Sequence, residues 1–157
     1  MIVYRISKRI YIKDLEGTGA GLYGGRWNPP GVRLLYTAGS VSLACLEFLV
    51  NNYHLLSPPD ICLAKIEIKT TAIKELEKDQ LPDQWDEKAF IPTFTQEIGA
   101  DFVKANEHYV LKIPSVIVSE EHNYLLNPNH PDHQKTIIKE VADPFSMDSR
   151  LFKSGKQ

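Results

Sequence analysis

The chain has 157 residues, a length that fits a single domain with a core of its own. Hydrophobic residues make up 43% and charged residues 24% of it, and the formal net charge is −2, as in an ordinary globular protein. No block of lysine and arginine indicates an extended nucleic-acid surface. No stretch approaches the ~20 apolar residues that span a bilayer, and Arg5 interrupts the apolar start that a signal peptide needs. We therefore expect a cytoplasmic protein that binds neither nucleic acid nor membrane directly.

The cysteines and histidines do not predict a metal site. Cys45 and Cys62 are the only cysteines, and both lie in apolar stretches, as expected of buried thiols in a reducing compartment. No Cys-x-x-Cys pair is present. His122, His130 and His133 fall within twelve residues, but asparagine and prolines make the stretch a loop without the spacing of a helical zinc site. We expect no metal, and His130 is interpreted as fixing the loop or lying near a substrate.

The first third of the chain alternates between short strands and a glycine-rich loop. Residues 2–6 are β-branched and aromatic and predict a strand, and residues 34–37 predict a second one. Between them, residues 14–33 contain six glycines and two prolines, which predicts a long loop whose backbone approaches a ligand closely. Ser40 is placed to cap a helix that runs to about Val50.

The middle of the chain predicts one strand and two helices. Polar and apolar residues alternate over residues 61–69, as in a half-buried strand. A short helix is predicted at residues 72–79, before a turn at Pro82. Thr93 begins another predicted helix, with Gln96 placed for a capping box. The expected core stripe of that helix consists of Phe94, Ile98, Phe102 and Ala105.

The last third of the chain predicts further strands and a docked end. Residues 109–118 are apolar and β-rich, but Pro114 requires a sheet edge, a bulge or a division into two strands. Residues 136–141 predict another strand. Residues 151–152 are expected to dock onto the domain, and residues 153–157 to fray.

These elements predict a single domain over residues 1–152. The sequence shows neither an internal repeat nor a linker. The order of strands and helices favours an α+β fold with a mostly antiparallel or mixed sheet and flanking helices.

Three polar residues stand out because apolar or glycine-rich segments surround them. Arg26 lies in Gly-Gly-Arg-Trp-Asn, Glu47 in Ala-Cys-Leu-Glu-Phe-Leu, and Ser115 in Ile-Pro-Ser-Val-Ile. Ionised side chains are rarely fully buried unless they are paired or functional, because desolvating an isolated charge is costly. A cation, a carboxylate and a hydroxyl in such settings indicate the polar lining of a ligand pocket, and therefore an enzyme.

These residues resemble the signature of the RES-domain family, the toxin half of Xre–RES toxin–antitoxin systems. The arginine, glutamate and serine of the family name match Arg26, Glu47 and Ser115. Further matching stretches are Leu-Tyr-Thr-Ala with Tyr36, Asn-Tyr-Leu-Leu-Asn-Pro-Asn-His-Pro at residues 123–131, and Pro-Phe-Ser-Met-Asp-Ser-Arg-Leu-Phe at residues 144–152. The resemblance therefore extends over most of the chain.

The resemblance implies a fold similar to that of ADP-ribosyltransferase toxins, whose small split sheet holds NAD in a cleft. It implies a toxin that cleaves the nicotinamide–ribose bond of NAD by hydrolysis or phosphorolysis, or that transfers ADP-ribose to a protein. NAD is then a substrate, with no further cofactor. It also implies a helix-turn-helix antitoxin of the Xre type that occludes the site and represses its own operon, and it is compatible with a homodimer of the toxin.

Glu47, Arg26 and Ser115 form the predicted catalytic set, and the two charged residues suit the chemistry. Cleavage of the nicotinamide–ribose bond develops positive charge on the ribose, which a carboxylate stabilises. We assign that role to Glu47. The alternative interpretation is that Glu47 is exposed on the helix and pairs with a lysine. Arg26 suits the pyrophosphate of NAD, because a guanidinium binds phosphate oxygens bidentately. The alternative for Arg26 is an ion pair within the loop.

Three more side chains are considered for the NAD pocket. Tyr36 is expected to stack on the nicotinamide ring or to bond the ribose, although a core position fits the sequence nearly as well. Ser115 either bonds a ribose or phosphate group, orients one of the charged residues, or relieves a bulge after the preceding proline. Asn28 is expected in the wall of the pocket, and Trp27 in hydrophobic packing.

Three other functions remain open at this point. ADP-ribosylation of a protein uses the same cleft with a different acceptor. A non-catalytic module that binds NAD or an antitoxin requires no carboxylate chemistry. A toxin that acts on RNA is disfavoured, because the sequence lacks basic stretches interleaved with aromatic residues.

Overall fold

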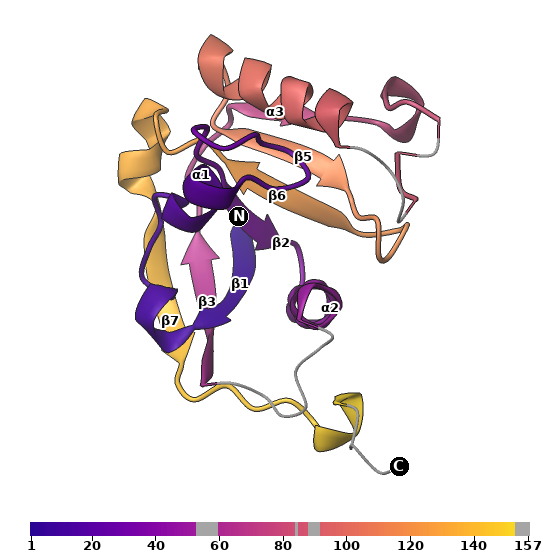
Figure 1. Ribbon diagram of the computed structural model, residues 1–157. Coiled ribbons are helices and arrows are strands. Elements are labelled where there is room, and N and C mark those ends of the chain that lie inside the picture. Colours follow the sequence, from indigo (N-terminus) through magenta and orange to yellow (C-terminus); the bar gives the residue numbers. More distant parts are fainter. Residues whose placement is uncertain (53–59, 84, 88–91, 153–157) are drawn as a thin grey trace.

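The computed structural model describes residues 1–52, 60–83, 85–87 and 92–152. The strands are β1 (Ile2–Lys8), β2 (Leu35–Ala38), β3 (Ile61–Glu67), β4 (Ile73–Glu75), β5 (Val110–Pro114), β6 (His122–Leu126) and β7 (Ile137–Ala142). The α-helices are α1 (Thr18–Tyr23), α2 (Val41–Asn51) and α3 (Thr93–Ala105), and short 3₁₀ turns lie at Arg9–Tyr11, Lys78–Gln80, Pro131–Lys135 and Ser149–Leu151. The described strands form one mixed sheet in the order β4-β5-β6-β2-β1-β3-β7 (Figure 1), which confirms the α+β prediction.

The sheet is nearly divided between β1 and β2. These two strands share a single registered Cα pair, Tyr4 with Ala38, whereas β1 pairs with β3 along its whole length. Figure 1 shows the consequence: β5 and β6 run in a different direction from β1, β3 and β7. The split sheet that the family resemblance implies is therefore present. Only the β4–β5 pair among the described strands is parallel.

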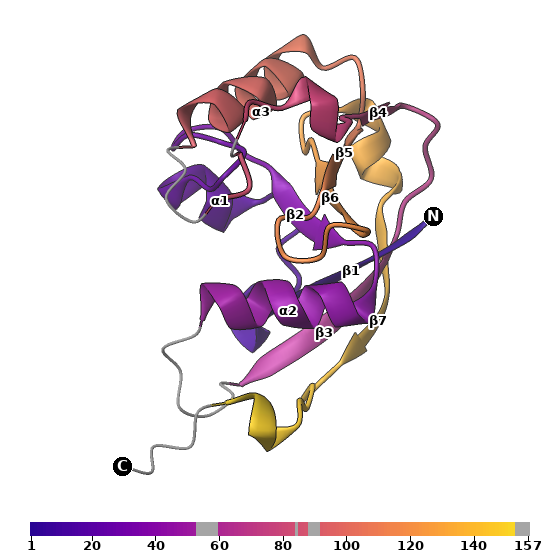
Figure 2. The same cartoon turned by 90° about the vertical axis from the view of Figure 1, so that its right-hand side faces the viewer.

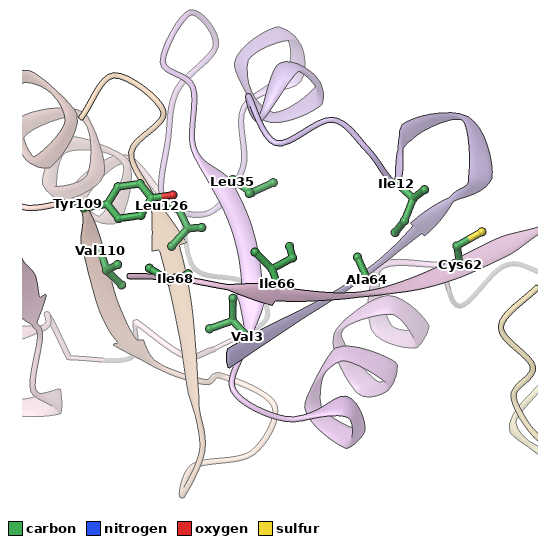
Figure 3. Packing of buried hydrophobic residues seen from close by; sticks show 10 residues of the cluster. All are labelled: Val3, Ile12, Leu35, Cys62, Ala64, Ile66, Ile68, Tyr109, Val110 and Leu126. Carbon is green, nitrogen blue, oxygen red and sulfur yellow. The ribbon is translucent and has the colours of Figure 1, made fainter. Parts of the chain in front are cut away.

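Each half of the sheet has its own helix. Helix α2 lies along β1 and contacts β2, while α3 lies against the half that contains β5 and β6 (Figure 2). The core beneath the β1-β3 half includes Val3, Ile66 and Tyr109, all closed to solvent (Figure 3). A second core packs under α3 and contains Trp27, Leu34, Leu76, Leu81, Trp85, Phe102, Leu111, Ile113 and Leu125. Both cores approach the boundary between the two halves of the sheet.

Several predicted elements are confirmed. The strands expected at residues 2–6, 34–37, 61–69 and 136–141 correspond to β1, β2, β3 and β7. The hydroxyl of Ser40 accepts a hydrogen bond of 3.0 Å from the backbone N–H of Leu43, so Ser40 caps α2 as expected. Strand β5 ends at Pro114, where the sequence required a break.

The helix predicted at residues 72–79 is wrong. Residues 73–75 form β4 instead, parallel to β5, and a 3₁₀ turn follows. The backbone N–H of Leu76 donates to the carbonyl of Lys112, and the carbonyl of Ala72 accepts from Tyr109 and Val110. Pairing with β5 therefore overrides the helical composition of this segment.

Helix α3 is present, but its predicted cap and core stripe are partly wrong. The cap position is Pro92, and the side chain of Gln96 binds elsewhere instead of forming a capping box. Phe94 is 47% exposed, whereas Thr95 and Gly99 are buried. Phe102 is buried as predicted, whereas Ala105 is exposed. Thr95 and Gly99 thus add small residues to the buried face, and these admit a neighbouring backbone.

Two elements were not predicted. The short helix α1 lies within the glycine-rich segment 14–33, and strand β6 lies in a stretch that was interpreted as loop. At the end of the chain Phe152 is buried against Ile61 and Met147, while Leu151 is 54% exposed, so only one of the two residues docks. The predicted fraying of residues 153–157 lies outside the described residues. In the part of the chain that the structure describes, no helix is long and apolar enough to cross a membrane.

Candidate functional site

A cleft with a cavity volume of about 420 Å³ opens where the two halves of the sheet meet. Its walls come from β1, β2 and α2, from the loop at residues 24–27, and from the ends of β5 and β6. Cavities of this size accept small organic ligands. The polar residues that line the cleft are Tyr4, Arg5, Arg26, Tyr36, Thr37, Glu47, Asn51, Asn52 and Asn123.

Glu47 projects from α2 into this cleft. Its Oε1 accepts a hydrogen bond of 2.5 Å from Nδ2 of Asn123 and one of 3.4 Å from the hydroxyl of Ser115. Burial raises the pKa of Glu47 above its ordinary value, and these two bonds and the positive charge of Arg26 oppose that rise. The sequence prediction that the glutamate lies on an apolar helix surface and serves a pocket fits this geometry.

Arg26 lines the same cleft from the loop at residues 24–27. Its Nη1 donates a hydrogen bond of 2.7 Å to the carbonyl oxygen of Trp85, which holds one nitrogen of the guanidinium in place. The charge of Arg26 acts on Glu47, so the cation and the carboxylate share one electrostatic environment. The structure therefore brings together the two charged residues that the sequence singled out, 21 positions apart in the chain.

Side chains of helix α3 bind the main chain of the loop that carries Arg26. The hydroxyl of Thr95 donates to the carbonyl of Arg26 at 2.6 Å, and Nε2 of Gln96 donates to the carbonyl of Gly25 at 2.8 Å. Gly99 packs so closely that a Cβ there would lie 1.7 Å from the carbonyl oxygen of Trp27. The small residues on the buried face of α3 thus explain how the loop is kept in place.

Tyr36 and Asn28 shape the loop from the other side. The hydroxyl of Tyr36 donates to Oδ1 of Asn28 at 2.7 Å and accepts from the backbone N–H of Trp27 at 3.1 Å. Burial raises the pKa of Tyr36 well above its ordinary value, so the hydroxyl stays protonated as a donor. A Cβ at Gly25 would lie 2.6 Å from this hydroxyl, which accounts for glycine there.

Asn28 does not lie where the sequence prediction placed it. Its side chain is fully buried, and its amide donates at 2.8 Å to the carbonyls of both Ala20 and Val32. Asn28 is also not among the residues that line the cleft. The expectation that its side chain contacts the ligand is therefore replaced by a role inside the loop, because its hydrogen-bonding groups are already used there.

Ser115 combines two of the roles that the sequence left open. Besides donating to Glu47, its oxygen accepts from the backbone N–H groups of Ile117 and Val118 at 3.0 and 3.2 Å. The serine therefore forms the turn after Pro114 and steadies the glutamate at the same time. It is 3% exposed, which leaves the carboxylate as the group that faces the cavity.

Trp27 and the histidines have structural roles. Trp27 is 3% exposed and packs against Trp85 with ring centroids 6.1 Å apart, as expected for packing. Nδ1 of His130 accepts from the backbone N–H of Asp132, and its ring stacks on Tyr109. His130 therefore fixes its loop. No group of three or more metal-ligating side chains occurs among the described residues.

Asn123 begins a stretch that matches the family, but the sequence predicted no role for it in the site. It lies on β6, pairs with Ala38 of β2, and lines the cleft. If residues 122–126 are a strand, Asn123 lies on the same face as Leu125, two residues further along. Leu125 is the residue that pairs with Tyr36. The polar composition of residues 122–124 concealed that strand.

The fold and the cleft together define a small α+β protein with the site of an enzyme: a half-buried carboxylate and a guanidinium line one ligand-sized cavity, and the charge of one acts on the other. The family model described as "RES domain" matches residues 2–148. The chain belongs to the RES domain family.

The chain is also similar to individual named toxins and to a protein of known structure. The chain is 41% identical over 160 residues to "Toxin Res" of Photorhabdus laumondii, covering 99% of this chain and 100% of the relative. It is 38% identical over 145 residues to "Prs ADP-ribosylating toxin" of Sphingobium sp., covering 83% and 85%. In the solved M. tuberculosis MbcT–MbcA toxin–antitoxin complex, one chain matches with a TM-score of 0.75 at 18% identity, covering 96% of this chain and 85% of that one. The last likeness shows the shared fold.

Proposed function

We propose that this chain is the toxin of a toxin–antitoxin pair and that it consumes NAD by cleaving the nicotinamide–ribose bond. Membership of the RES domain family and relatives named "Toxin Res" support the toxin role. The observation that carries the chemistry is the shared cleft of Glu47 and Arg26, a carboxylate and a guanidinium that line one cavity and interact electrostatically.

The proposed reaction breaks the bond between C1′ of the ribose and the nicotinamide nitrogen. The bonding electrons leave with nicotinamide, which departs as a neutral molecule, and the ribose develops positive charge. Glu47 stabilises that charge across the cavity. Water or inorganic phosphate then adds to the same carbon and loses a proton. The product is ADP-ribose with water, or ADP-ribose phosphorylated at that carbon with phosphate.

The other residues bind and orient in this proposal. Arg26 anchors the pyrophosphate, since its charge is permanent and the carbonyl of Trp85 orients the guanidinium through Nη1. The ring of Tyr36 faces the nicotinamide end, while its hydroxyl holds the loop. Ser115 steadies Glu47. The donor set of the cleft requires no metal in this scheme.

A second candidate is ADP-ribosylation of a protein, which a relative named "Prs ADP-ribosylating toxin" favours. The same cleft would generate the same ribosyl cation, and a side chain of the target protein would replace water or phosphate. Accumulation of free product distinguishes the first reaction from label retained on a protein.

The partner of the proposed toxin is a cognate antitoxin, since the matched fold was solved in a toxin–antitoxin complex. We further propose the Xre helix-turn-helix class for this antitoxin, a cytoplasmic location, and a toxin able to form a homodimer. Co-purification of the toxin with the neighbouring gene product, followed by determination of its mass in solution, tests these points.

To test the reaction, the purified chain is incubated with NAD in the presence and in the absence of phosphate. Chromatography then measures the nicotinamide that is released. Release by the wild type that is lost in Glu47→Gln is expected, and dependence on phosphate identifies the nucleophile. Intact NAD in the presence of the folded wild type would contradict the proposal. Radiolabelled NAD added with a cell extract then tests the second candidate.

A further inference from the structure

Both hydrogen bonds that described residues donate to the Glu47 carboxylate fall on the same oxygen. Nδ2 of Asn123 and the hydroxyl of Ser115 each donate to Oε1, and no described residue donates a hydrogen bond to Oε2. A carboxylate held by one oxygen cannot rotate freely, so its two oxygens have different surroundings. The free oxygen is the one available to a ligand in the cavity.

The two donors differ in what else they do. The oxygen of Ser115 also serves the turn of residues 115–118, and its bond to Glu47 is long at 3.4 Å. Asn123 has no such second partner among the described residues, and its bond measures 2.5 Å. Asn123 therefore supplies the stronger constraint on the carboxylate.

Asn123 is itself rigidly placed. Strand β6 lies between β5 and β2, and Asn123 is in register with Ile113 on one side and Ala38 on the other. Strand geometry points its side chain to the face that bears the cleft, whereas those of His122 and Tyr124 point to the opposite face. A donor on a central strand holds a side chain of α2 more precisely than one on a loop.

We propose that Asn123 is a positioning residue of the site: its amide fixes Oε1 of Glu47 so that Oε2 faces the substrate. This inference rests on the proposed function, since the substrate oxygen or cation that Oε2 meets belongs to that reaction. Asn123 acts through Glu47 and makes no contact with the reacting atoms. The amide also favours the ionised form of Glu47, because it donates to the charged oxygen.

The remaining charged and titratable groups of the cleft do not replace this donor. Arg26 acts on Glu47 by its charge and donates its Nη1 to the carbonyl of Trp85. Tyr36 uses its hydroxyl in the loop, and Arg5 donates to the carbonyl of Asp14. Tyr4 lines the cavity from β1 without a hydrogen bond to the carboxylate.

The experiment is a titration of the Glu47 carboxyl by carbon-13 NMR in the ligand-free protein, assigned by the signal that Glu47→Gln removes. Asn123→Ala is expected to move the midpoint of that titration to higher pH, and His122→Ala, on the same strand but the opposite face, is expected to leave it in place. If Asn123→Ala does not fold, the isosteric Asn123→Asp replaces it and is expected to move the midpoint further, because a second carboxylate then faces Oε1.

Kinetics supply the second measurement. In nicotinamide release, Asn123→Ala is expected to lower kcat about 10-fold or more while KM changes less than about 3-fold, with the acid limb of the pH profile moved to higher pH. A Glu47 titration that is the same in folded wild type and Asn123 variants overturns the inference. The titration needs no substrate, so it tests the role of Asn123 independently of the reaction. If the wild type releases no nicotinamide, the proposed function is wrong, but the titration still shows whether Asn123 holds Glu47.

Discussion

The hydroxyl of Tyr36 donates a hydrogen bond of 2.7 Å to Oδ1 of Asn28 and thereby ties strand β2 to the loop that carries Arg26. The same hydroxyl accepts from the backbone N–H of Trp27. Because both bonds are used within the protein, the ring of Tyr36 is the part that the cleft offers to a ligand. Asn28 and Tyr36 thus both hold the Arg26 loop, but only Tyr36 lines the cleft.

Tyr36→Phe is expected to lower the free energy of unfolding by about 1–3 kcal/mol, because Oδ1 of Asn28 and the N–H of Trp27 lose a buried partner. Nicotinamide release is expected to fall as the Arg26 loop loosens. Urea unfolding measures the first effect. Tyr124→Phe is the control, since no described residue bonds that hydroxyl, and an equal loss of stability in both variants would count against the role of Tyr36.

Gly99→Ala is expected to cost more than about 2 kcal/mol, because the new Cβ would overlap the carbonyl of Trp27 and force α3 away from the loop. Activity should decline although α3 contributes no side chain to the lining of the cleft. Gly19→Ala is the matched control: it is a helical glycine with nothing within 4 Å of the added carbon. That variant is expected to gain about 0.5–1 kcal/mol. Thermal unfolding of the pair would contradict the packing argument if Gly99→Ala were the more stable.

Glu47→Gln is expected to stabilise the fold at neutral pH. Burial raises the pKa of Glu47, so the folded protein binds this proton more tightly than the unfolded chain does. Stability due to this group is therefore present below the unfolded pKa and is lost as the pH rises through the folded pKa. Urea unfolding near neutral pH should give the variant the higher midpoint, with a difference that shrinks as the pH falls from the folded pKa towards the ordinary glutamate pKa and disappears below it. A difference that is constant with pH would mean that the charge is well accommodated.

Arg26→Lys is expected to weaken NAD binding about 10-fold or more, because an ammonium cannot bind a pyrophosphate bidentately. Calorimetry in the Glu47→Gln background measures binding without turnover. Arg33→Lys provides the control, since Arg33 is exposed and lies outside the lining of the cleft. Equal affinities of the Arg26 and Arg33 variants for NAD would remove Arg26 from the phosphate role.

The sequence predicted elements well where local chemistry decides structure. Ser40 caps α2 because a serine hydroxyl satisfies an otherwise unpaired N–H, and the alternation at residues 61–69 is a half-buried strand. It failed at residues 73–75, where composition favours a helix but β5 offers a strand partner from 37 positions away. Pairing at such distances is not encoded in local periodicity.

The candidate site was predicted as a set of residues but not as an arrangement. Arg26, Glu47 and Ser115 stand out because polar groups in apolar segments are costly, and the structure does place them around one cleft or against its carboxylate. Asn28 looked equally suited, yet its amide is consumed inside the loop. Asn123 escaped notice because an asparagine beside a histidine resembles a turn until its two neighbouring strands are known.

Helix α3 grips the Arg26 loop through the carbonyl oxygens of residues 25 and 26, groups that every amino acid possesses. A new side chain at position 26 therefore leaves both anchors intact. If the proposed function holds, such a variant lacks activity while its loop keeps its shape, so a cell can express it in quantity. Immobilised on a column, it would then retain the proposed antitoxin from an extract.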